Sequence, residues 1–87
     1  MSDNIYSKPW FVYIAECKDG TFYAGIAKDV DKRINVHNRT NKCRYTRFRK
    51  PLELKYKQMC SNYNTARKRE REIKKFSREK KFALINS

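Results

Sequence analysis

Acidic residues are scarce in this sequence, and their shortage defines its electrostatic character. Nine Asp and Glu stand against 22 Lys and Arg, which gives a formal net charge of +13 over 87 residues. A surplus of this size on one small domain is the electrostatic footprint of a polyanionic partner, and nucleic acid is the first candidate. The alternative is a basic surface that serves solubility alone.

Long apolar runs, paired-cysteine motifs and histidines are also scarce. No run approaches the roughly 18 apolar residues of a membrane-spanning helix, and no signal peptide opens the chain, so we expect a cytoplasmic protein without a membrane partner. Cys17, Cys43 and Cys60 form no CxxC motif, which argues against a disulfide framework. Because His37 is the one histidine, a zinc site would lack ligands, and any metal should be a hard cation held by oxygen.

The pattern of apolar and turn-forming residues predicts an α+β fold in the order β-β-α-β-α-α. We expect strands at 10–17, 21–26 and 52–57, and helices near 30–38, at 65–75 and after residue 77. These elements would form a small three-stranded antiparallel sheet with helices packed on it. Residues 1–8 are predicted to be a flexible N-terminus ahead of a single domain over 9–87.

Helix boundaries and inward-facing positions follow from the same pattern. Asp29, Asn64 and Ser77 are the predicted N-caps of the three helices. On the last helix, Phe82 and Ile85 are expected to point inward. In the third strand, Leu52, Leu54 and Tyr56 alternate with charged residues, as in a strand with one buried face.

The hairpin between the first two strands decides whether Tyr13 and Tyr23 share a face. A two-residue Asp19-Gly20 loop would place the two tyrosines on opposite faces of the ribbon. A three-residue loop that begins at Lys18, with Gly20 at a positive φ, would place them on one face. The residues of the loop permit either geometry.

Two side chains on the first predicted helix are candidates for chemistry. Arg33 and His37 are four residues apart, so they share a helix face and flank a short apolar stripe. A cation and a proton carrier in that position suit phosphate binding and proton transfer. Alternatively, Arg33 extends along the surface and His37 fills a packing gap.

Glu70 is the carboxylate that stands out on the second predicted helix. It falls at i+4 from Ala66 and three residues before Ile73, on the inward-facing stripe, whereas Glu72 points elsewhere. A carboxylate among core-facing residues is unfavourable unless it is paired, hydrogen-bonded or metal-bound. The pattern therefore leaves two interpretations: a structural ion pair with Arg33 or a lysine, or a ligand for Mg²⁺ or Mn²⁺.

The segment 42–50, KCRYTRFRK, carries five cations interleaved with two aromatic residues. That combination suits contacts with a nucleic-acid backbone together with base stacking, and the alternative is a solvated charged loop. The residues predicted to bind nucleic acid are Lys28, Lys42, Arg44, Tyr45, Arg47 and Arg49.

Several of these candidates follow one another in a familiar order. The chain contains Val12-Tyr13-Ile14, then Tyr23-Ala24-Gly25, then Arg33-x-x-x-His37, and finally Glu70 on a later helix. This ordered set resembles the GIY-YIG endonuclease superfamily. The segments KCRYTR and ARKREREIKKFSREKKFALI are similar to those of small stand-alone bacterial members related to the nuclease domain of the excinuclease subunit UvrC. The resemblance covers about residues 9–85, although the first motif lacks its glycine and the second reads Tyr-Ala-Gly.

The resemblance implies a metal-dependent endonuclease that hydrolyses phosphodiester bonds in DNA. Both tyrosines would line one active site, which favours the three-residue hairpin loop. Glu70 would hold one Mg²⁺ or Mn²⁺ ion, and Arg33 would bind the phosphate. Tyr23 would take a proton from the attacking water. Tyr13 would orient the water or a phosphate oxygen, and His37 would share the proton with Tyr23 or position it. Nearby cations, Arg33 and the metal, would have to favour the Tyr23 phenolate, because a free phenol has a pKa of about 10.

Two rival functions remain at this level. One is a module that holds nucleic acid on a nuclease scaffold without cutting it, and the other is a basic ribonucleoprotein component. Binding alone would not need Glu70, because a carboxylate at a phosphate-binding surface weakens binding unless a cation lies between them. The stacking residues of 42–50 favour single-stranded or structured DNA as the substrate.

Overall fold

The chain folds around a three-stranded antiparallel sheet. The computed structural model describes residues 9–87, and the predicted flexible segment 1–8 lies outside them. The elements are β1 (Trp10–Glu16), β2 (Phe22–Ala27), α1 (Val30–Arg39), β3 (Glu53–Cys60), α2 (Tyr63–Lys74) and α3 (Arg78–Ile85). The strand order is β2-β1-β3, with β1 in the centre. The predicted α+β class and element order are confirmed.

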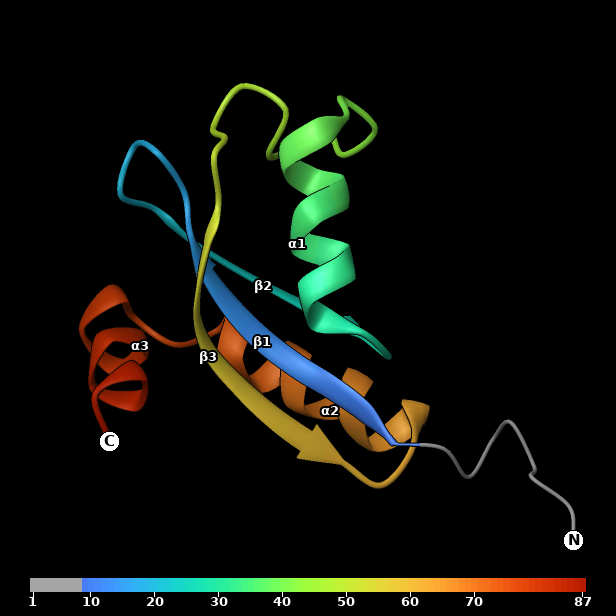
Figure 1. The fold of residues 1–87 in the computed structure, drawn as a ribbon. Coiled ribbons are helices and arrows are strands. Elements are labelled where there is room, and N and C mark those ends of the chain that lie inside the picture. The colour runs from blue at the N-terminus through green and yellow to red at the C-terminus, as the bar shows by residue number, and fades with distance from the viewer. Residues whose placement is uncertain (1–8) are drawn as a thin grey trace, which may run out of the picture.

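Helices cover both faces of the sheet, with α1 on one face and α2 on the other (Figure 1). The residues of β1 alternate between two cores because successive side chains of a strand point to opposite faces. The core on the α2 side buries Val12, Ile14, Ala24, Ala66 and Ile73, and the core on the α1 side buries Tyr13, Ala15, Ala27, Val30 and Leu52. Among the described residues, no helix has the length and apolar character needed to cross a membrane.

The β1–β2 hairpin has the three-residue loop. The amide of Cys17 donates to the carbonyl of Thr21 at 2.8 Å, and Gly20 takes φ +86°. In this register Tyr13 pairs with Gly25, and Tyr23 pairs with Ala15. Both tyrosines therefore lie on the α1 side of the sheet, as the family resemblance required.

A bulge in β3 overturns the expectation that this strand buries one face only. Ile14 pairs with Tyr56 but Ala15 pairs with Leu54, so Lys55 is an extra residue in the ladder. An extra residue shifts the two-residue period by one position. As a result, Leu54 packs in the core on the α1 side, whereas Tyr56 packs in the core on the α2 side.

Two of the three predicted helix caps are confirmed, and one is wrong. The side chains of Asp29 and Ser77 accept from backbone amides at the starts of α1 and α3. The cap of α2 is Asn62 rather than Asn64, because the Asn62 side chain accepts from the amide of Thr65 at 2.9 Å and the helix begins two residues earlier.

Of the two inward residues predicted for α3, Ile85 is confirmed and Phe82 is wrong. Phe82 is 58% exposed, whereas Leu84 and Ile85 pack against the core on the α2 side. Leu84 lies about 200° around the helix from Phe82, so the packing of Leu84 turns Phe82 toward solvent. The first turn of α3 also contacts the domain, because the Arg78 side chain donates to the carbonyl of Gly20 at 2.7 Å.

Candidate functional site

Tyr13 lies at the centre of the candidate site, on the middle strand of the sheet. Its side chain is buried and extends across β2 at the position of Gly25. A Cβ built on Gly25 would be 2.7 Å from the Tyr13 hydroxyl oxygen, a separation that side chains do not tolerate. The glycine of the Tyr23-Ala24-Gly25 motif is therefore required for the close approach of the Tyr13 phenol.

A buried polar chain connects Tyr13 to the loop after α1. The Tyr13 hydroxyl lies 3.3 Å from Nε2 of His37, and Nδ1 of His37 lies 2.9 Å from Oγ1 of Thr46. Burial, together with the positive charge of Arg33, lowers the pKa of His37 below its ordinary value. The imidazole is thus neutral at neutral pH, and one ring nitrogen donates while the other accepts.

Tyr23 completes an aromatic cluster around this chain. Its ring centroid lies 5.3 Å from that of His37, 5.5 Å from that of Tyr45 and 6.4 Å from that of Tyr13. Its hydroxyl lies 3.9 Å from Sγ of Cys43. The structure therefore brings the two motif tyrosines and the histidine together on one side of the sheet, next to the basic loop.

Both tyrosines are held in their protonated forms. Burial raises the pKa of Tyr13 to about 12, although Arg33 acts in the opposite direction. Burial also raises the pKa of Tyr23, reinforced by Tyr13 and Cys43 and opposed by Arg33. Arg33 thus favours the Tyr23 phenolate, as predicted, but its effect is smaller than that of burial.

Arg33 lies at the mouth of a small cavity beside His37. Its side chain is exposed on α1, one turn before His37. The cavity has a volume of about 120 Å³ and is lined by Arg33, Val36, His37, Thr40, Lys42 and Cys43. Two cations at its rim favour an anionic group, and the histidine forms part of its wall.

Glu70 reaches the site region from α2, on the other side of the sheet. Its side chain is 15% exposed, and its carboxylate lies 4.0 Å from Nε of Arg67 and 3.4 Å from Nζ of Lys74. The ion-pair interpretation therefore holds with a lysine, and no pair with Arg33 is present among the described residues. Both separations exceed those of charge-assisted hydrogen bonds, so the oxygens keep capacity for a further ligand.

A second cavity links the surroundings of Glu70 to those of Tyr23. It has a volume of about 340 Å³ and is lined by Phe22, Tyr23, Ala24, Tyr45, Lys74 and Lys81. Lys74 contacts the Glu70 carboxylate and also faces this cavity. The negative charge of Glu70 also raises the pKa of Tyr13, by less than burial does. Residues from α2 and from the tyrosine cluster thus meet at the β2 edge of the sheet.

The donor set around Glu70 suits only one kind of metal site. Within residues 9–87, no group of three or more His, Cys, Asp or Glu side chains is placed to hold an ion. Mg²⁺ is commonly held by one or two carboxylates, with water and substrate phosphate as the other ligands. A single, largely buried carboxylate next to a lysine that lines a cavity fits that pattern and does not fit a structural zinc site.

The residues predicted to bind nucleic acid fall into two places. Lys42 and Arg44 are exposed in the loop after α1, and Tyr45 is 44% exposed beside Tyr23. Lys28 lies apart from this loop, with its Nζ 5.4 Å from the ring of Trp10.

The other two predicted contacts also have structural partners. Arg49 donates to Asp19 at 3.1 Å and to the carbonyl of Tyr45 at 2.7 Å, and stacks on the Tyr45 ring. The guanidinium of Arg47 lies 5.0 Å from the ring of Phe48, and its buried Nε has no hydrogen-bond partner among the described residues. Because the Arg49 guanidinium is held by Asp19 and by the Tyr45 carbonyl, Arg49 mainly stabilises the conformation of the loop.

Sequence reasoning missed Thr46, Cys43 and Lys74. The first two lie in a loop without periodicity, where the chain pattern cannot indicate which side chains turn inward. Lys74 is one of many lysines, and only its position four residues after Glu70 on the same helix face could have singled it out.

Comparisons with protein families, protein sequences and solved structures all find similar proteins. The GIY-YIG catalytic domain model matches residues 9–83. A UPF0213 protein of Staphylococcus saprophyticus is 49% identical over 76 residues, which cover 87% of this chain and 93% of the relative. A UPF0213 protein of Staphylococcus aureus strain Mu50 is 48% identical over 75 residues, covering 86% and 92%. The solution NMR structure of the UPF0213 protein BH0048 from Bacillus halodurans matches with a TM-score of 0.57 and 40% identity, covering 90% of this chain and 83% of that one.

Proposed function

Because this chain belongs to the GIY-YIG catalytic domain family, we propose that it is a metal-dependent endonuclease that hydrolyses phosphodiester bonds in DNA. The family match confirms the resemblance found in the sequence and suggests nuclease activity. The observation that carries the proposal is the buried Tyr13–His37–Thr46 chain beside Tyr23 and Arg33. Burial of a hydroxyl and an imidazole is unfavourable compared with apolar packing residues, and titratable groups held in this way beside a cavity are typical of functional sites.

Each residue of the cluster has a role in this proposal. Arg33 binds the scissile phosphate and stabilises the charge that develops on it. Tyr23 in its phenolate form, after its own proton has passed to solvent, accepts a proton from the attacking water while the new P–O bond forms and the bond to the leaving oxygen breaks. Tyr13 orients the water or a phosphate oxygen, and neutral His37 holds the Tyr13 hydroxyl in place.

Glu70 is the proposed metal ligand. A bound Mg²⁺ or Mn²⁺ ion would neutralise charge on the scissile phosphate and leaving oxygen and would help Tyr23 to lose its proton. Burial, reinforced by Tyr13 and Cys43, raises the pKa of Tyr23, so the phenol is a poor base until cations approach it. Glu70 also keeps Lys74 at the wall of the cavity that Tyr23 lines.

The preferred substrate in this proposal is single-stranded or structured DNA. The cavity of about 340 Å³ beside Tyr23 combines aromatic walls with two lysines. Aromatic faces stack on unpaired bases, and lysines contact the phosphates between them. A paired base inside a duplex cannot reach such a cavity without leaving its stack.

Cleavage of an end-labelled oligonucleotide tests the proposal directly. The protein should cut with Mg²⁺ or Mn²⁺ and should not cut in chelator. Tyr23→Phe and Glu70→Gln should each reduce cleavage by about 100-fold or more, while the dissociation constant for DNA changes little. Cleavage in chelator would remove Glu70 from its role.

The same measurements separate cutting from binding. DNA binding without any cleavage under these metal conditions would favour the non-catalytic module. Full cleavage by both variants would show that the mechanism is wrong even if the protein is a nuclease.

A further inference from the structure

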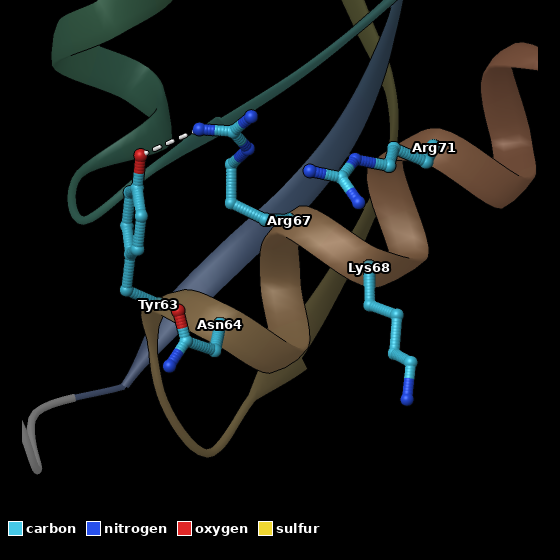
Figure 2. A pocket seen from close by; sticks show the side chains of 5 residues that line it. All are labelled: Tyr63, Asn64, Arg67, Lys68 and Arg71. Carbon is cyan, nitrogen blue, oxygen red and sulfur yellow. Dashed lines mark hydrogen bonds between the residues drawn. The ribbon is translucent and has the colours of Figure 1, made fainter.

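The solvent face of α2 carries a basic hollow that the catalytic proposal does not use. It has a volume of about 400 Å³ and is lined by Tyr63, Asn64, Arg67, Lys68 and Arg71. Figure 2 shows Tyr63, Arg67 and Arg71 along one row of the helix, with Asn64 and Lys68 in the neighbouring row. No carboxylate lines this hollow.

The cations of α2 and its C-cap are concentrated on one arc that begins beside Glu70. With 3.6 residues per turn, each residue advances about 100° around the helix. Lys74, Arg67, Arg71, Lys75 and Lys68 then follow Glu70 in that angular order, within about 160°. All five are exposed, whereas Ala66 and Ile73 on the other side of Glu70 are buried.

Glu70 offsets one of these five positive charges through its pairs with Arg67 and Lys74. Glu72, the other acidic residue of α2, pairs with Arg69 at 2.9 Å on a different side of the helix. Within residues 9–87, Lys68, Arg71 and Lys75 form no ion pair. Like charges three or four residues apart destabilise a helix, so this arrangement is unfavourable until an anion neutralises it.

We propose that the surface formed by Tyr63, Arg67, Lys68, Arg71 and Lys75, the α2 basic face, binds the phosphodiester backbone of nucleic acid that flanks the cleavage site. The inference rests on the proposed nuclease function for the position of that site. The cations from Arg67 to Lys75 span about 12 Å of helix, and Tyr63 extends the surface to about 18 Å. It begins next to Glu70, so a strand held there can continue into the cavity beside Tyr23.

Two neighbouring features favour nucleic acid as the ligand of the α2 basic face. The ring centroids of Tyr63 and Trp10 are 4.8 Å apart, and the Lys28 ammonium lies over the Trp10 ring. Lys28, a predicted nucleic-acid contact, therefore lies at one end of the α2 basic face. A membrane surface fits poorly, because an interfacial helix needs a free apolar face. The apolar face of α2, with Ala66 and Ile73, is buried in the core.

The test measures binding by fluorescence anisotropy in chelator, so that cleavage plays no part. The probes are a labelled 10-nucleotide single strand, and the same strand extended on one side by 12 nucleotides, either single-stranded or paired to a complement. The variant is Lys68→Gln/Arg71→Gln. A matched control, Lys32→Gln/Lys80→Gln, removes two exposed cations that line neither this hollow nor the site.

We expect the wild type to bind at least one extended probe more tightly than the short one. The α2 variant should lose about tenfold on that probe and less than twofold on the short strand, and its slope of log affinity against log salt should fall by about two. The charge-preserving variant Lys68→Arg/Arg71→Lys should retain wild-type binding. The two extended probes show whether single or paired backbone is held.

Equal losses for the α2 variant and the control would overturn the inference, as would a wild type that gains nothing from the extension. The outcome is separable from that of the nuclease proposal. If the protein never cuts but the α2 variant loses binding of the extended probe, the binding surface is supported and the nuclease proposal is wrong. If the protein cuts but the α2 variant shows no selective loss, the nuclease proposal is supported and the binding surface is wrong.

Discussion

The hydroxyl oxygen of Tyr13 lies 2.7 Å from the position that a Cβ would occupy on Gly25. These residues are directly paired on neighbouring strands, so the first tyrosine motif and the glycine of the second form one structural unit. The phenol of Tyr13 reaches across β2 toward the sheet edge because residue 25 has no side chain. In this way the hairpin register positions the proposed active site.

Gly25→Ala should therefore displace Tyr13. Overpacking of this kind destabilises a protein by about 1–3 kcal/mol. A shift of about 1 Å in a positioning group can reduce the turnover rate about 100-fold, so we expect a loss of that order in kcat. The measurements are urea denaturation and single-turnover cleavage at saturating substrate.

Gly20→Ala provides the matched control for that substitution. Gly20 has φ +86° in the hairpin loop, and a Cβ there would have no neighbour within 4 Å. The change should reduce stability by about 1–2 kcal/mol through backbone strain and leave cleavage per folded molecule unchanged. Equal catalytic losses in the two variants would contradict the role given to the Tyr13–Gly25 contact.

Thr46→Val should impair catalysis although residue 46 does not contact the proposed substrate. The variant removes the hydroxyl next to His37 Nδ1 and leaves a buried polar atom unsatisfied, at about 1–3 kcal/mol of stability. Groups that orient a metal-bound histidine contribute about 10-fold to 100-fold, and we expect kcat to fall by a factor of that order here, with KM little changed.

Thr46→Ser should restore both kcat and the state of the imidazole. Because the chain has one histidine, its ¹⁵N resonances report the His37 tautomer without interference. A wild-type tautomer balance in Thr46→Val would show that Thr46 is only a packing residue.

Protonation of His37 should make the protein less stable in mild acid. Burial and Arg33 hold the pKa of His37 below the ordinary 6.5 in the folded state, so the unfolded chain takes up a proton first as the pH falls. Stability that depends on neutral His37 is thus fully present above pH 6.5 and is lost as the pH falls through the folded-state pKa. The difference in unfolding free energy between wild type and His37→Gln should shrink from pH 7.5 to 5, measured by urea denaturation. A constant difference would contradict the depressed pKa.

Local patterns in the sequence predicted the helices and strands. Features that depend on contacts between distant segments could not be predicted from the sequence. The helical phase of α2 selected Glu70 over Glu72, and the structure keeps Glu72 more exposed. The hairpin residues permitted two registers, and only the family resemblance selected the one that places both tyrosines together. The bulge at Lys55 was not predictable, because the alternating pattern of β3 is the same with or without an extra residue in the pairing.

The residues of the candidate site could be predicted only where they follow a local pattern. Arg33 and His37 were found because helical spacing places them on one face, but Thr46 lies in a loop whose path depends on tertiary contacts. Asn38 fixes that path by hydrogen bonds in both directions with the backbone of Leu52, at 3.0 and 2.6 Å. Neither residue belongs to a pattern that predicts the other as its partner.

Cys43 should be the reactive thiol of this protein, and its modification should block cleavage. Cys17 and Cys60 are buried, whereas Cys43 is half-buried at the small cavity beside Arg33. Burial raises the pKa of the Cys43 thiol, but its hydrogen bonds, those with Thr46 first, outweigh this and hold the pKa below the ordinary value. A lowered pKa enlarges the thiolate fraction that reacts.

N-ethylmaleimide should add once to the folded protein, at Cys43, as intact-mass and peptide spectrometry can show. The adduct would fill the cavity beside Arg33 and contact Tyr23, whose hydroxyl lies 3.9 Å from Sγ, so cleavage should fall at least tenfold. Cys43→Ser should cut like the wild type and resist the reagent. Full activity of the singly labelled protein would show that the cavity beside Arg33 does not receive the substrate phosphate.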